Sequence, residues 1–215
     1  MKIIVKNARL SFNDLFTAKA IKGGAPRFSA TLICLDGSDA SELQTTITYK
    51  NSEGNNVTKD FSKMSDICEH VMKEKWGKVP KKIDNWCFNK ADGSTTRAAF
   101  TNDEDEFYAG FNEETFYIVA AKQEERCINK KMTVLDQRRD PIEPSSGLIF
   151  SGCYVNAVID VYPYDNETGK GVTASLEGIQ LKKKGDALGF TQIDAADEFD
   201  EEEFDEDETD ADDLL

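Results

Sequence analysis

Apolar and polar residues alternate along much of this chain, which is the pattern of β-strands with one buried face. The alternation is clear over residues 1–12 and 27–34, and the stretch between them, 19–26, has the Gly and Pro content of a turn. These segments predict a β-hairpin that opens a sheet. One face of the first strand is expected to carry Ile4, Ala8, Leu10 and Phe12.

Helical signals occupy the next part of the chain. Apolar residues three and four positions apart from Ser62 onward predict a helix that ends at Gly77. Residues 40–49 predict a second helix, weakened by β-branched threonines. Strands then return, the last two joined by a hairpin loop at 165–169, over residues 116–122, 131–135, 148–162 and 172–181.

This order of elements predicts a mainly β protein. Five or six mostly antiparallel strands around one or two short helices fit a small barrel of the oligonucleotide/oligosaccharide-binding (OB) type. A βαβ repeat would require a helix between all of its strands. We expect one folded domain over residues 1–193 and a disordered acidic tail over 194–215.

Charge is divided sharply between these two parts. The formal net charge is −15, and residues 194–215 contain 14 acidic residues and no basic ones. The remaining 193 residues carry 26 basic and 27 acidic residues, so the body is nearly neutral. A segment with this density of acids cannot collapse, which predicts disorder.

Several classes of protein are excluded by simple counts. No run of about 18 apolar residues is present, which excludes a membrane-spanning helix, and the first residues lack the layout of a signal peptide. The five cysteines form an odd set without a C-x-x-C pair, which argues against a disulfide framework or a zinc ribbon. We therefore expect a cytoplasmic protein without a metal or cofactor.

The strand over 149–164 has two faces of different kinds. One face is mainly aliphatic and predicts core, whereas the other carries several aromatic rings. Such rings can stack on the bases of a single strand whatever their identity. The alternative is that they pack beneath the helix or against each other across strands. The candidate stacking residues are Phe150, Tyr154, Tyr162 and Tyr164.

Basic residues supply the other half of a nucleic-acid site. They cluster within residues 122–139 and around two tryptophans, and would neutralise phosphates in a salt-dependent way. The alternative is an ordinary solvated charged face. The candidates are Lys122, Arg126, Lys130, Lys131, Arg138 and Arg139, together with Arg27, Lys82, Trp76 and Trp86.

Several segments, taken together, resemble a known family. Ala8-Arg-Leu-Ser-Phe12, Tyr108-Ala-Gly-Phe111 and Phe150-Ser-Gly-Cys-Tyr-Val-Asn-Ala157 are similar to strand patterns in the phage single-stranded-DNA-binding proteins of the podoviral replication type. The resemblance implies an OB-fold, coating of exposed single strands in replication or recombination, and recruitment of DNA polymerase or other replication proteins through the tail. Such tails commonly end in an aromatic residue, whereas this chain ends in Leu214-Leu215.

The tail itself predicts two roles. A tethered polyanion competes with nucleic acid for any cationic groove within reach. Its apolar and terminal residues would remain available to a partner protein; the alternative is a tail that only increases solubility. The candidate partner-binding residues are Phe199, Phe204, Asp212, Asp213, Leu214 and Leu215.

Other function classes are less well supported by the sequence. The only histidine, His70, lies near Cys68 without an orienting motif, and no phosphate-binding loop is present. A metal-dependent nuclease using Asp160, Asp165 and Glu177, or an acidic chaperone or nucleic-acid mimic acting through the tail, remains an alternative. We expect a non-enzymatic, sequence-independent binder of single-stranded DNA, and a homodimer remains open.

Overall fold

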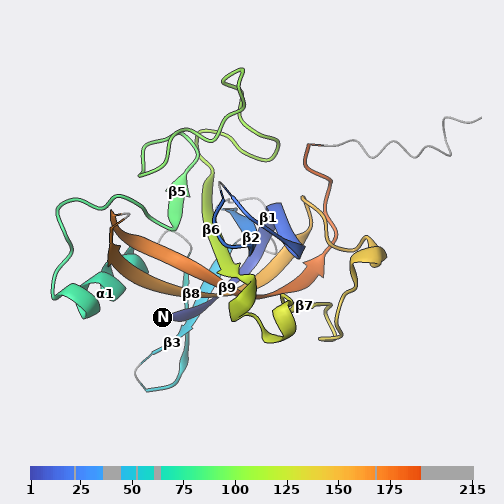
Figure 1. Cartoon of the computed structure of the whole chain (residues 1–215), viewed down its shortest axis with the longest axis horizontal. Helices are drawn as coiled ribbons and strands as arrows, with labels where there is room; N and C mark the ends of the chain where they lie inside the picture. Colours follow the sequence, from blue (N-terminus) through green and yellow to red (C-terminus); the bar gives the residue numbers. More distant parts are fainter. Residues whose placement is uncertain (22, 36–44, 52, 61–63, 168, 190–215) are drawn as a thin grey trace, which may run out of the picture.

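The computed structural model describes residues 1–189 except 22, 36–44, 52, 61–63 and 168 (Figure 1). Within these residues the strands are accompanied by one helix, α1 (Met64–Trp76), and by three 3₁₀ turns, η2 (Glu124–Arg126), η3 (Ile128–Lys130) and η4 (Pro144–Ser146). The strands are β1 (Lys2–Lys19), β2 (Arg27–Cys34), β3 (Thr46–Lys50), β4 (Asn56–Asp60), β5 (Phe88–Lys90), β6 (Phe116–Gln123), β7 (Val134–Leu135), β8 (Tyr154–Asn166) and β9 (Gly169–Lys183).

Five strands close into a barrel in the order β1-β2-β6-β9-β8, because β1 pairs with both β2 and β8. Neighbours are antiparallel except at one junction, where β6 and β9 run parallel at Ala120 and Ala174. A closed ring with an odd number of strands cannot alternate direction throughout, so one parallel junction is unavoidable. The expected mainly β, OB-fold-like barrel is confirmed.

The core follows the predicted alternation on β8. Val155, Ala157, Ile159 and Val161 are completely buried, and Cys153 just before the strand is buried with them. Their neighbours in sequence are partly or fully exposed, as expected for a strand with one face on the core. The hairpin between the last two strands is also confirmed, since β8 and β9 pair as far as Asn166 and Gly169.

The predicted face of β1 was wrong at both of its ends. Ile3 and Val5 are buried in place of Ile4. Asn7 has a positive φ of 58° at a β-bulge between Val5 and Ala8, and the extra residue reverses which side faces inward. Ala8 and Leu10 share one face as predicted, and both are buried. A second positive φ, 41° at Phe12, turns that ring out of the core.

The helix expected over residues 40–49 was also wrong within its described part. Thr46–Lys50 forms β3, which pairs with β1 on one side and β4 on the other. β-branched residues pack well on a pleated sheet, and these two pairings outweigh the weak helical pattern. The helix expected from Ser62 is confirmed as α1, and Gly77, with φ 71°, ends it by donating to the carbonyl of Lys73 at 2.8 Å.

Two predicted strands are shorter than expected. Of residues 131–135 only Val134 and Leu135 are in a strand, and β8 begins at Tyr154 and not at 148. Gly152, at φ 121°, interrupts the extended backbone where the chain at Asp186 crosses it. The predicted tail, 194–215, lies outside the described residues.

Candidate nucleic-acid interface

The outer side of the β2 and β6 ladder is a strip of small side chains. Phe28, Ala30 and Leu32 of β2 point into the barrel core, so the residues between them lie on the other side of the sheet. Arg27 and Ser29 are partly exposed there, whereas Thr31 is buried and Ile33 packs with Tyr117 in a second buried cluster. On this outer side Ser29 pairs with Ala121 and Thr31 pairs with Val119. We call this strip, Arg27 to Ile33 on β2 and Tyr117 to Gln123 on β6, the β2–β6 face. In OB-folds the corresponding strands and the adjoining loops bind oligonucleotides.

An arginine stands at each end of the β2–β6 face. Arg27 pairs with Gln123 at one end, and the guanidinium of Arg97 acts electrostatically on Tyr117 at the other. Burial raises the pKa of Tyr117, and the positive charge of Arg97 partly opposes that rise. The six-residue separation of Arg27 and Ile33 corresponds to about 20 Å of strand.

Both arginines carry a buried nitrogen that the protein leaves unpartnered. The Nε atoms of Arg27 and Arg97, and the hydroxyl of Tyr117, make no hydrogen bond within the described residues. A buried donor without a partner is costly, and such donors in native proteins usually serve a ligand, water or ion. Both arginine side chains are partly exposed, so their guanidinium groups could contact phosphate oxygens at either end of the face.

An aromatic cluster borders the Tyr117 end of this face. Phe12 of β1 lies edge-on to Tyr108 and Phe100, with ring centroids 5.0 and 5.4 Å apart. Phe100 packs on Tyr117 at 4.9 Å and on Phe111 at 4.6 Å. Phe12 and Tyr108 remain 47% and 37% exposed, so the cluster presents two rings to solvent. We call these five residues the aromatic cluster.

Sequence reasoning did not select the aromatic cluster as a site. Phe12 was predicted only to share a face of the first strand with Ile4, Ala8 and Leu10, and Tyr108 and Phe111 entered only as part of a family-like segment. The exposure of Phe12 follows from its left-handed backbone, and its neighbours come from a segment about 90 residues away. The glycine at position 110 was the one signal in the sequence that this segment forms a turn with neighbouring aromatic rings near the surface.

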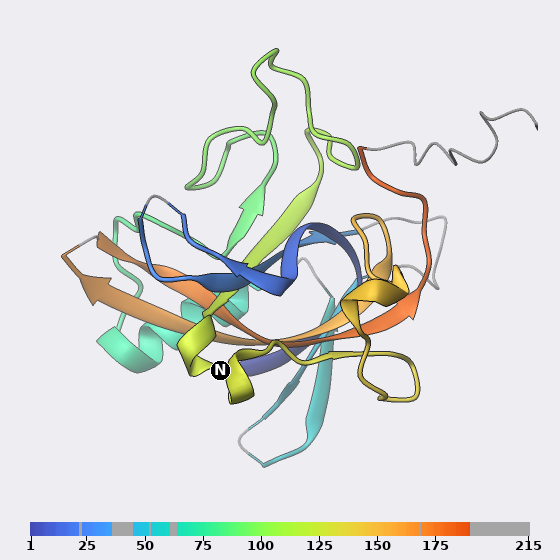
Figure 2. The same ribbon diagram turned by 45° about the vertical axis from the view of Figure 1, so that its right-hand side comes forward.

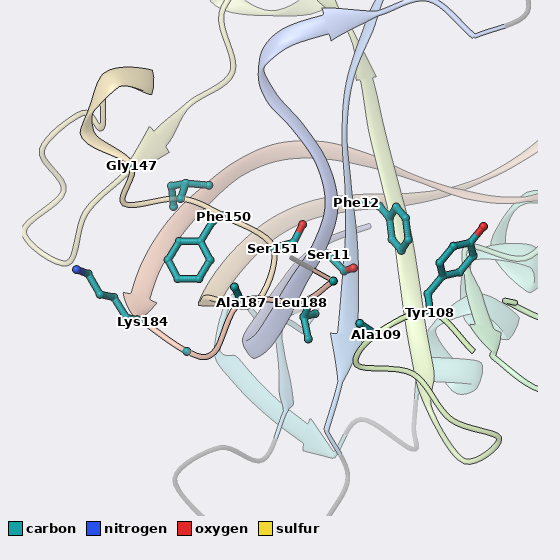
Figure 3. Close-up of a pocket in the computed structure, with 13 residues that line it drawn as sticks. Ser11, Phe12, Tyr108, Ala109, Gly147, Phe150, Ser151, Lys184, Ala187 and Leu188 are labelled. Carbon is teal, nitrogen blue, oxygen red and sulfur yellow. The ribbon is translucent and has the colours of Figure 1, made fainter. Parts of the chain in front are cut away.

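A trough of about 1120 Å³ continues from the aromatic cluster, lined by residues of the 147–151 segment and of the 184–189 segment after β9. Figure 3 shows Phe12 and Tyr108 at one end and Phe150 and Lys184 at the other, with Ser151 and Leu188 between them. Ser11 links the two surfaces, since it lines the trough and pairs with Thr31 on the β2–β6 face. Aromatic rings at both ends and a cation at one rim are features that suit a single nucleic-acid strand.

The last described residues form one wall of this trough. The amide of Leu188 donates to the carbonyl of Ser151 at 2.8 Å, and Arg9 Nη2 donates to the carbonyl of Asp186 at 2.9 Å. Gly189 also lines the trough. The described chain therefore ends at the trough with Gly189, which lies beside Ala109.

The predicted aromatic row on β8 is divided between two distant places. Phe150 lines the trough, and Tyr154 lies nearby with Arg9 and Lys183 over its ring at 6.0 and 5.2 Å. A base could stack there only by displacing those cations. Tyr162 is 39% exposed near the far end of the strand, which Figure 2 shows as a long ribbon crossing the molecule.

Three predicted aromatic residues gather around the tip of the β8–β9 hairpin. Tyr164 is half-buried against Gly171, and Trp86 packs partly buried against the core. Trp76, at the end of α1, lies beneath the ammonium of Lys170 at 4.8 Å. These rings connect the hairpin tip to the helix and to the following loop. Much of their surface is therefore covered by other protein groups and is not available to a base.

The predicted basic cluster also divides. Lys122 contacts Glu177 at 2.6 Å. Burial would raise the pKa of Glu177, but hydrogen bonds from Lys122 and Ser175 outweigh burial and leave that pKa below its ordinary value. Lys82 lies 3.7 Å from Asp84. The others are exposed and form no ion pair within the described residues: Arg126, Lys130, Lys131, Arg138 and Arg139.

The candidate partner-binding residues of the tail, Phe199 to Leu215, lie outside the described residues. Across the described part of the chain no group of three or more His, Cys, Asp or Glu side chains could hold a metal ion. None of its helices combines the length and the apolar character that crossing a membrane requires.

Comparisons with known proteins agree with this architecture. "Putative protein p50" of Acyrthosiphon pisum secondary endosymbiont phage 1 is 31% identical over 94% of this chain and 94% of its own length. The single-stranded DNA-binding protein of bacteriophage Enc34 has the same fold, with a TM-score of 0.55 at 21% identity over 93% of this chain and 90% of that one. Its complex with ssDNA matches with a TM-score of 0.56 at 22% identity, covering 87% and 89%.

A family model described as the ssDNA-binding protein of Enterobacter phage Enc34 matches residues 1–211, nearly the whole sequence. The chain therefore belongs to the Enc34 ssDNA-binding protein family.

Proposed function

We propose that this protein binds single-stranded DNA without sequence preference and does so without catalysing a reaction. The strand would run along the β2–β6 face, pass the aromatic cluster and enter the trough. The observation that carries the proposal is the pair of exposed rings, Phe12 and Tyr108, beside a strip with an arginine at each end. Membership of the Enc34 family supports the same ligand.

Each part of this path has a distinct physical role. Phe12, Tyr108 and Phe150 would stack on bases, and each such contact is worth about 1–3 kcal/mol. Arg27, Arg97 and Lys184 would hold phosphates. Stacking and phosphate contacts carry no information about base identity, so the protein would coat exposed strands of any sequence during phage DNA replication or recombination in the host cell.

The tail would compete with DNA for this path. The described chain ends at Gly189, which lines the trough, and only residues 190–193 separate it from the segment that carries the 14 acids. When DNA displaces the tail, its apolar residues Phe199 and Phe204 and its terminal Leu214-Leu215 would become free to recruit replication proteins such as DNA polymerase. Deleting residues 190–215 should tighten binding to a dT oligonucleotide, most strongly at low salt. Unchanged or weaker binding would contradict competition.

The binding itself is tested by fluorescence anisotropy with labelled dT and duplex oligonucleotides across a salt series. Tyr108→Ala should weaken dT binding at least fivefold, as expected from the loss of one stacked base. Phe107→Ala is the matched control, because Phe107 is equally exposed at 38% but no ring contact joins it to the aromatic cluster. Equal affinities for both variants would remove the cluster from the site. Cleavage of either oligonucleotide with magnesium present would favour the nuclease alternative.

A further inference from the structure

Ile128 is the large apolar side chain with the greatest exposure among the described residues. It is 84% exposed, whereas the isoleucines of the barrel strands β2, β6 and β8 are buried. It lies in the connection between β6 and β7, at the start of η3, and Figure 2 shows these turns directly after the end of β6. An apolar side chain that stays exposed contributes almost no burial free energy to folding, so the stability of the domain does not explain an isoleucine in this position.

The backbone around Ile128 is a hydrogen-bonded double turn. Cys127 donates to the carbonyl of Glu124 at 3.0 Å, Lys130 donates to Cys127 at 3.1 Å, and Lys131 donates to Ile128 at 3.1 Å. Asn129 and Lys130 adopt left-handed conformations in succession, with φ of 53° and 54°. Asparagine tolerates that region, but lysine does so only at a cost. A strained, hydrogen-bonded turn holds the side chain outward and is a recurrent feature of ligand-contacting loops.

This turn begins where the proposed DNA path ends. Arg27, at one end of the β2–β6 face, pairs with Gln123, the residue before η2. The amide of Glu124 then donates to the carbonyl of Pro26 at 3.0 Å, which ties the turn to the β1–β2 connection. A strand that follows the face past Arg27 is therefore delivered to the loop that carries Ile128.

Charges beside Ile128 fit a nucleic acid. Arg126 precedes it and Lys130 and Lys131 follow it, and all three are exposed with no ion pair within the described residues. Glu124 and Glu125 leave the turn with a net excess of one positive charge. Proteins that open or kink a duplex insert one aliphatic side chain between base pairs while nearby cations hold the flanking phosphates.

A protein partner fits this feature less well. Energetically important positions in protein interfaces lie in clusters of apolar and aromatic residues that bury each other from water. Ile128 has a polar residue after it, and Cys127 before it is only partly exposed. One isolated aliphatic side chain can act as a wedge but supplies little of such an interface.

We propose that Ile128 is a wedge that inserts against the terminal base pair where a bound single strand meets a duplex, and so opens that pair. The proposal rests on the proposed function, because the path along the β2–β6 face brings the junction to this loop. It adds an activity, opening of duplex ends, to the coating of strands that are already single. Arg126 and Lys130 would hold the phosphates on either side of the opened step.

The test uses the full-length protein and a hairpin with a dT tail, carrying 2-aminopurine in the base pair next to the tail. The fluorescence of 2-aminopurine rises when it unstacks, which reports opening directly. Ile128→Ser should reduce the opened fraction at saturating protein about fivefold, because the variant loses the apolar contact with the face of the base pair. Ile128→Val, which keeps a branched apolar side chain, should retain most of the opening.

Binding of plain dT oligonucleotide separates this proposal from the one on which it rests. Ile128→Ser should bind dT within about twofold of the wild type, because the side chain lies beyond the stacking path, and its thermal unfolding should be unchanged since the side chain is exposed. Equal opening by the wild type and by Ile128→Ser, with dT binding intact in both, would overturn the wedge while leaving strand binding in place. Failure of the wild type to bind dT would instead refute the proposed function.

Discussion

Replacing Phe12 by glycine removes a proposed stacking ring at a position where the backbone already suits glycine. Phe12 has a φ of 41°, which costs an L-residue about 1–2 kcal/mol and costs glycine essentially nothing. The ring lies edge-on to Tyr108 and Phe100, and each such pair contributes about 0.5–1.5 kcal/mol. These two effects oppose each other, so the free energy of unfolding should change by no more than about 1–2 kcal/mol.

The effect on DNA binding should be larger and of a specific kind. Loss of one stacked base corresponds to about 1–3 kcal/mol, a decrease in dT affinity of roughly 5- to 150-fold. The ring carries no charge, so the slope of log affinity against log salt should stay the same. Fluorescence anisotropy with dT at four or five salt concentrations measures both quantities, and thermal denaturation checks the fold. A folded Phe12→Gly variant with wild-type dT affinity would refute the stacking role of the aromatic cluster.

Four further substitutions test other parts of the structure. Arg27→Gln and Arg97→Gln should each weaken dT binding and reduce the magnitude of the salt slope by about 1, in contrast to Phe12→Gly; an unaltered slope would exclude phosphate contacts. Gly152→Ala should destabilise the fold by about 2–4 kcal/mol in urea unfolding, because its φ is 121° and a Cβ would lie 2.0 Å from the carbonyl oxygen of Asp186. The folded-state pKa of Glu177 lies below 4.5, so its ion pair stabilises the fold above that pH and the gain is lost on acidification. In the Glu177→Gln variant the free energy of unfolding should therefore fall less steeply as the pH is lowered. The same dependence on acidic pH in variant and wild type would show that the ion pair does not contribute to stability.

Local pattern was sufficient for most of the barrel. The alternation over residues 27–34 predicted β2 at its observed bounds, and the aliphatic face of β8 is buried as expected. Such predictions succeed because side chains alternate sides along any extended strand, a property that neighbouring residues fix among themselves. They failed on β1, where one left-handed residue, Asn7, reversed the faces, and at β3, where pairing with two strands outweighed a weak helical pattern.

The candidate site depended far more on contacts between distant parts of the chain. Aromatic residues on β8 were the natural choice in the sequence, and Tyr162 is indeed exposed, but the structure also brings together two exposed rings, Phe12 and Tyr108, that lie 96 positions apart. Lys122 was predicted to bind phosphate, but in the structure its ammonium group is paired with the carboxylate of Glu177, which lies 55 positions away in the sequence. A local sequence pattern cannot predict the ring contacts or the ion pair, because both join residues that are distant in the sequence.

The sequence alone determined the division of charge, a nearly neutral body followed by 14 acids, because composition requires no folding to be known. It also determined the strand-rich class of the body, since periodicity is local. The tertiary structure decided which rings reach solvent, which cations form ion pairs within the described residues, and that Gly189, shortly before the acidic segment, lines the trough. Exposure and ion pairing depend on what the rest of the chain brings alongside a residue, and only the closed barrel establishes those neighbours.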